Sequence, residues 1–151
     1  MADDDVDGAF ENIIARSVEL YDDGKYEEVL KKYEEASTLD PQQGLSWYMK
    51  GMTLLKLGRF GEALMAFDMA SKLDPDIIEP LIGKAFTLFK LFRFDDAINT
   101  FKTIFVRKMS TDIAFMIGLC YLINENMEQA EVWMKKAIAV SYTHLTLPTK
   151  A

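Results

Sequence analysis

The chain has 151 residues, and half of them are apolar, so it is long enough and apolar enough to bury a continuous core. Its 24 acidic and 17 basic residues give a formal net charge of -7, which opposes binding to phosphate backbones and to anionic lipid surfaces. We therefore expect neither nucleic acid nor a membrane among its partners.

The first nine residues form an acidic N-terminal tail. This segment carries Asp3, Asp4, Asp5 and Asp7, where a secretory signal would have a basic patch followed by an apolar run. The longest apolar run, residues 113–123, is well short of the roughly 20 residues that cross a bilayer. We therefore expect a cytoplasmic protein without a membrane span.

From residue 10 onward, apolar residues recur at helical spacing in segments joined by short turns. Gly24 and Gly58 suit the positions just after helix ends. Proline disfavours helical geometry in the residue before it, so the dipeptides 40–41 and 74–75, both Asp-Pro, predict breaks between helices. The chain is predicted to be all-α, with four helix pairs over about residues 10–43, 44–77, 78–110 and 111–140.

An internal repeat supports these boundaries. Residues 56–63, Lys-Leu-Gly-Arg-Phe-Gly-Glu-Ala, are followed 34 positions later by residues 90–97, Lys-Leu-Phe-Arg-Phe-Asp-Asp-Ala. Five of the eight pairs are identical. Such a period is typical of stacked helix pairs, in which small residues let two helices approach and large ones fill the remaining space.

The repeat resembles the tetratricopeptide repeat family, whose pattern has Trp, Gly, Tyr or Leu, Ala, Phe, Ala and Pro in successive columns. In the second unit these columns hold Trp47, Gly51, Leu54, Ala63, Phe67, Ala70 and Pro75. The other units follow the pattern with departures, among them Ser17, Val29 and Met109. The resemblance implies a right-handed superhelical solenoid of antiparallel helix pairs, which acts as a scaffold or adaptor for other proteins.

Residues that carry chemistry are sparse, so we expect no enzyme, no cofactor and no metal site. His144 is the only histidine and Cys120 the only cysteine, and Cys120 lies in an apolar stretch where a free cysteine usually behaves as a small hydrophobe. Adjacent carboxylates such as Asp95 and Asp96 fall at turns or helix starts, where negative charge favours the helix dipole.

In this family the first helix of each repeat forms the inner, concave face. Stepping by four and three residues along each first helix gives twelve apolar positions, which we call the apolar strip: Ile14, Val18, Tyr21, Tyr48, Met52, Leu55, Ile82, Phe86, Phe89, Phe115, Leu119 and Leu122. Exposed apolar surface of this kind is typical of a binding groove for a protein or peptide with an apolar segment. The alternative is that these residues only pack neighbouring helices together.

One function known in the family is not expected. Members that grip the acidic tails of chaperones use two lysines, two asparagines and an arginine on this face. The matching positions here hold Ile14, Val18, Met49, Glu79 and Gly83, or, one repeat further on, Tyr48, Met52, Gly83, Asp112 and Met116.

Residues 140–149, Val-Ser-Tyr-Thr-His-Leu-Thr-Leu-Pro-Thr, fit no repeat column. They resemble one reading frame of a transposase adapter used in preparing sequencing libraries, so residues 141–151 are interpreted as a non-native tail. This threonine-rich, β-prone segment is expected to interrupt the last helix. Two further functions stay open: self-association through an uncapped C-terminal repeat, and regulation within a longer protein that carries a catalytic domain elsewhere.

Overall fold

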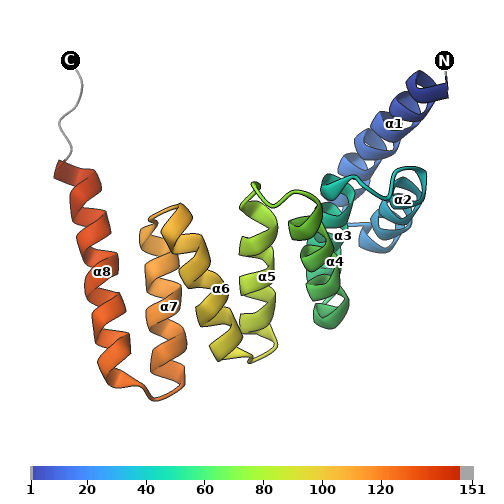
Figure 1. The fold of residues 1–151 in the computed structure, drawn as a ribbon. Coiled ribbons are helices and arrows are strands. Elements are labelled where there is room, and N and C mark those ends of the chain that lie inside the picture. Colours follow the sequence, from blue (N-terminus) through green and yellow to red (C-terminus); the bar gives the residue numbers. More distant parts are fainter. Residues whose placement is uncertain (1, 147–151) are drawn as a thin grey trace. The chain divides into compact units, whose positions relative to one another are not determined.

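The computed structural model describes residues 2–146, with side chains from residue 7 onward, and within that range it contains helices and no strand. The all-α prediction is therefore confirmed for this part of the chain (Figure 1). The helices are α1 (Ala2–Asp22), α2 (Tyr26–Leu39), α3 (Gly44–Lys56), α4 (Phe60–Leu73), α5 (Glu79–Lys90), α6 (Phe94–Arg107), α7 (Thr111–Ile123) and α8 (Met127–Thr146).

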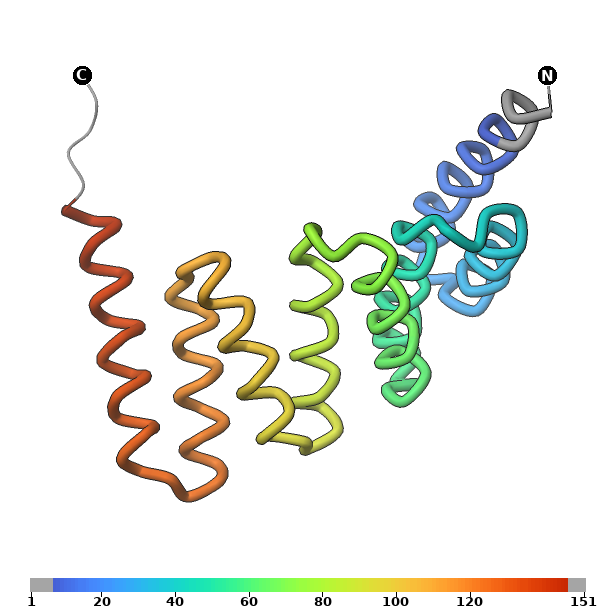
Figure 2. The backbone as a smooth tube through the Cα atoms, viewed as in Figure 1, coloured from blue at the N-terminus to red at the C-terminus, as the bar shows by residue number. Residues whose placement is uncertain are grey.

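The contacts divide the chain into two compact units, Met1–Thr87 and Leu88–Ala151, with the boundary inside α5. In the first unit α1 packs on α2, α2 on α3 and α3 on α4. In the second unit α6 packs on α7 and α7 on α8, and Figure 2 shows α7 and α8 as antiparallel neighbours joined by a short turn. Each unit is therefore built from consecutive helices that pack on the next one along the chain.

Small residues face large ones inside both units, as the repeat pattern predicts. Phe67 is fully buried, and a Cβ atom added at Gly51 or Gly83 would lie 2.7 or 2.5 Å from its ring. In the second unit, a Cβ at Gly118 would lie 3.0 Å from the methyl carbon of Met134. Glycine is required at positions 51 and 83 because the ring of Phe67 occupies the space that a Cβ atom would need, whereas at Gly118 the flexible end of Met134 would have to move only slightly.

Ser17 replaces the glycine of the first repeat without disrupting it. Its side chain is fully buried, and its hydroxyl donates a hydrogen bond of 2.7 Å to the carbonyl oxygen of Ile13. A serine can therefore occupy this column because the preceding turn of its own helix satisfies its polar group.

The turns between paired helices place one residue in the left-handed region. Gly24 and Gly58 have φ angles of 75° and 71°, which confirms their predicted role after helix ends. At the corresponding turns of the later repeats the same region is occupied by Phe92 and Glu125, with φ angles of 58° and 59°. Neither position was predicted from the sequence, because neither residue is a glycine.

The predicted breaks at the two Asp-Pro dipeptides are confirmed. Helix α2 ends at Leu39 and α4 at Leu73, so Asp40 and Asp74 follow the last helical residue in each case. Proline at the next position prevents the helix from continuing.

Both ends of the described range differ from the sequence-based expectations. Helix α1 begins at Ala2, so the acidic segment at the N-terminus is helical and continuous with the first repeat helix. The expected interruption of the last helix at residue 140 is wrong, because α8 continues to Thr146. Hydrogen bonds from the Thr143 and Thr146 hydroxyls to the carbonyls of Ala139 and Tyr142 accompany this extension. Residues 147–151 of the predicted tail lie outside the described residues.

Candidate partner-binding surface

The structure places all twelve residues of the apolar strip on the first helix of a pair, namely α1, α3, α5 and α7. None of the twelve is buried. Four of them are substantially exposed, with exposed fractions of 46% for Val18, 37% for Phe86, 49% for Phe115 and 44% for Leu122. The strip therefore exposes apolar side chains to solvent in both units.

The alternative role of these residues, packing between helices, also has support in the first unit. Ile14 and Tyr21 pack against a core cluster of Leu20, Val29 and Tyr33. Likewise, Tyr48, Met52 and Leu55 pack against a buried cluster that includes Leu54 and Phe67. One side of each of these residues therefore belongs to the core, while the other side contributes to the surface.

Helices α3 and α5 enclose a cavity of about 280 Å³ in the first unit. Its lining consists of Tyr48, Met52, Leu55, Glu79, Ile82, Gly83 and Phe86. Five of these seven are residues of the apolar strip, and we call this space the α3–α5 cavity. Its apolar wall is fixed in place because the ring of Tyr48 packs on buried Phe67, with 6.0 Å between the ring centres.

The two tyrosines on the first-unit part of the strip remain protonated at neutral pH. Burial raises the pKa of Tyr48, and the negative charge of Glu79 raises it further. Burial also raises the pKa of Tyr21, although the positive charge of Lys56 opposes this effect. Both hydroxyl groups are therefore neutral hydrogen-bond donors within a mainly apolar surface.

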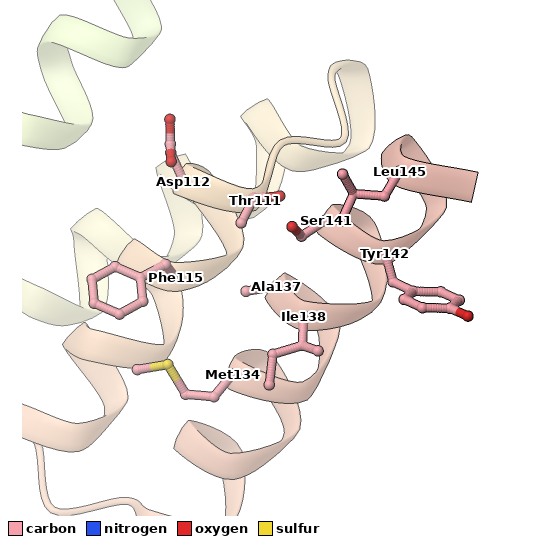
Figure 3. Close-up of a pocket in the computed structure, with 9 residues that line it drawn as sticks. All are labelled: Thr111, Asp112, Phe115, Met134, Ala137, Ile138, Ser141, Tyr142 and Leu145. Atoms are coloured by element: carbon pink, nitrogen blue, oxygen red, sulfur yellow. The ribbon is translucent and has the colours of Figure 1, made fainter. Parts of the chain in front are cut away.

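In the second unit the strip residues do not share one cavity. Phe89 packs edge-to-face against Phe94, with 5.5 Å between the ring centres. Leu119 is half-buried and Leu122 is exposed. Phe115 lines a larger cavity of about 650 Å³ between α7 and α8. Figure 3 shows the side chains around it, which come from Thr111, Asp112, Phe115, Met134, Ala137, Ile138, Ser141, Tyr142 and Leu145.

The α8 side of this larger cavity was not predicted from the sequence. Ile138, Tyr142 and Leu145 are 69%, 68% and 81% exposed and follow one another at spacings of four and three residues. That spacing is the same signal that defined the strip on the first helices. It was missed because residues 140–149 were expected to end the helix.

Other chemistry is sparse in the part of the chain that the structure describes. Among the side chains that the structure describes, residues 7–146, there is no cluster of three or more histidine, cysteine or acidic residues able to hold a metal ion. Cys120 is fully buried, and burial raises the pKa of its thiol to about 11, which agrees with its interpretation as a small hydrophobe. None of the described helices combines the length and the apolar character needed to cross a bilayer.

Comparison with known proteins assigns the family. One sequence profile of the tetratricopeptide repeat matches residues 14–76, and a second matches residues 111–144. The comparison with curated proteins gave no match.

Solved structures share the fold at low sequence identity. A MamA structure from Desulfovibrio magneticus RS-1 is 22% identical, with a TM-score of 0.82 over 87% of this chain and 75% of that one. Another MamA crystal structure is 16% identical, with a TM-score of 0.86 over 94% and 78% of the two chains. A tetratricopeptide repeat protein from Parabacteroides merdae is 20% identical, with a TM-score of 0.82 over 88% and 54%.

These matches define the class of protein as an all-helical repeat solenoid. The chain belongs to the tetratricopeptide repeat family, whose members are generally scaffolds for protein–protein interaction and are typically non-catalytic.

Proposed function

We propose that this protein is a cytoplasmic adaptor whose first helices bind an apolar peptide segment or helix of another protein. The observation that carries this proposal is the α3–α5 cavity, where five strip residues from two helices surround one space. Aromatic and methionine side chains, such as those of Tyr48, Phe86 and Met52 in this cavity, are enriched in protein–protein interfaces.

The size of the cavity is small for a site that holds a whole ligand. Pockets for small molecules usually measure about 300–1,000 Å³ and enclose most of the ligand. The α3–α5 cavity, at about 280 Å³, lies at the lower limit of that range. It therefore fits one or two apolar side chains of a longer segment, while the rest of that segment contacts the surrounding surface.

The proposal is tested with a fluorescein-labelled, end-blocked peptide of 14 residues that has Leu and Phe at helical spacing and Gln at the other positions. Binding is measured by fluorescence anisotropy. Phe86 is large, rigid and part of the cavity wall, so Phe86→Ala should weaken binding by on the order of 2 kcal/mol, or about thirtyfold.

Phe92→Ala is the matched control, because Phe92 is 79% exposed and lies in the turn after α5, outside the strip. It should leave the affinity unchanged. Circular dichroism verifies that both variants keep their helical content. Equal affinity of the two variants, or no binding to the unsubstituted protein, would contradict the proposal.

Self-association is a second candidate, favoured by the exposed apolar residues Ile138, Tyr142 and Leu145 on α8. They line the larger cavity of the second unit, which a second copy of the chain could cover. Analytical ultracentrifugation over a range of protein concentrations distinguishes this candidate, since a monomer at every concentration would exclude it.

A further inference from the structure

Glu79 differs in charge from every other residue that lines the α3–α5 cavity. It is the first residue of α5, its side chain is exposed, and the other six lining residues are uncharged. Within residues 7–146, no hydrogen bond or ion pair involves its carboxylate. A full negative charge therefore lies at the edge of an apolar cavity without a cation beside it.

Stabilisation of the helix explains why an acidic residue stands at the start of α5. It does not explain why this residue lines the α3–α5 cavity. Carboxylates in the first turn of a helix interact favourably with its dipole. Glu128 occupies the same kind of position on α8 and lines neither the α3–α5 cavity nor the larger cavity of the second unit. The position of Glu79 beside Tyr48 and Phe86 is therefore an additional feature of the α3–α5 cavity.

The same two helices carry four lysines. Lys56 and Lys90 are the last residues of α3 and α5, whereas Glu79 is the first residue of α5, and no ion pair joins either lysine to Glu79 within residues 7–146. The other two lysines are engaged elsewhere. Lys84 on α5 forms an ion pair of 2.6 Å with Asp68. Lys50 on α3 lies over the ring of Trp47 and within 3.9 Å of Glu34. A cation that complements Glu79 would therefore have to come from the ligand.

We propose that the α3–α5 cavity accepts an apolar side chain from a peptide segment that carries a lysine or arginine next to it, and that Glu79 pairs with this cation. This inference rests on the proposed function. It specifies in addition that the bound segment carries a positive charge next to its apolar side chain. A basic residue gains an attraction at the rim, whereas an acidic residue at the same place is repelled. The neutral hydroxyl of Tyr48 contributes a hydrogen-bond donor at the same cavity.

The test uses two further peptides with the same Leu and Phe residues, in which every Gln is replaced by Lys or by Glu. An exposed pair of opposite charges contributes modestly, so we expect the lysine peptide to bind about tenfold more tightly than the glutamate peptide. The net charge of -7 also favours the lysine peptide. The informative quantity is therefore the change in this affinity ratio when Glu79 is substituted.

Glu79→Lys should reduce the ratio to about one, and Glu79→Gln should give an intermediate value. Glu128→Lys is the matched control, because it makes the same change of charge in the first turn of another helix and outside the cavity. It should keep most of the preference. Measurements at about 0.15 M salt limit the long-range contribution of net charge.

The outcomes separate the two proposals. If Glu79→Lys and Glu128→Lys change the ratio equally while Phe86→Ala still weakens binding, the role of Glu79 is overturned and the proposed function stands. If none of the three peptides binds the unsubstituted protein, both proposals are overturned.

Discussion

At the scale of single residues, the turns between paired helices show how the repeat tolerates substitution. Four turns require a left-handed residue, and two of them use residues other than glycine. A side chain makes this conformation unfavourable by about 1 kcal/mol or more, because its Cβ atom approaches the following carbonyl oxygen. Phe92 and Glu125 are therefore positions where the backbone conformation lowers the stability of the fold. Glycine, which stands at the corresponding turns of the first two repeats, would avoid this cost.

Replacing Glu125 by glycine should raise the free energy of unfolding by about 0.5–1 kcal/mol, since it removes this strain. Chemical denaturation measures the change. Gly58→Ala is the matched control, since it introduces a Cβ atom at the same kind of turn, and it should lower stability by a similar amount. Loss of stability in Glu125→Gly would show that its side chain contributes more than its backbone conformation costs.

The same turns show what the sequence can predict at this scale. Gly24 and Gly58 were identified because glycine after a helix is itself a signal. Phe92 and Glu125 give no such signal, and only their position within the repeat places them in the corresponding turns. Likewise, the hydrogen bond from the Ser17 hydroxyl to the Ile13 carbonyl explains the departure at this column, and it could not be predicted from the sequence.

At the scale of the helix, the two breaks predicted from proline are confirmed, and the predicted end of the last helix, which no proline precedes, is wrong. Helices α2 and α4 end before Asp-Pro dipeptides, as expected. Helix α8 has no proline before position 148, so it continues through the β-prone residues that were expected to end it. Intrinsic β-propensity is a weak preference, and an established helix extends at little cost.

Deleting residues 141–151 should change the free energy of unfolding by less than about 1 kcal/mol. The side chains of residues 141–146 are exposed, and Val140 is the last buried residue of α8. Thermal and chemical denaturation measure the effect. As a control, deletion of residues 137–151 also removes the buried side chains of Ala137 and Val140, and should destabilise the protein by about 2 kcal/mol or more. Equal losses in the two deletions would show that the tail is an integral part of the fold.

At the scale of the whole molecule, the sequence predicted which helices carry the apolar strip but not how its residues combine. The spacing of four and three residues placed all twelve on first helices. It did not predict the α3–α5 cavity, since this cavity depends on how α3 and α5, which α4 separates along the chain, are placed beside each other in space. Glu79 was assigned to the same face from the repeat pattern, but its place at the edge of the cavity was not predicted, for the same reason.

Methyl NMR with labelled methionine locates the bound peptide directly and tests the central claim, that the first helices bind an apolar segment. Met52 lines the α3–α5 cavity, whereas Met65 on α4 is 72% exposed and lies outside the strip. On titration with the glutamine peptide, the methyl signal of Met52 should shift until the site is saturated, and that of Met65 should stay in place. An unchanged Met52 signal at peptide concentrations where anisotropy shows binding would contradict the account, because the peptide would then occupy another surface.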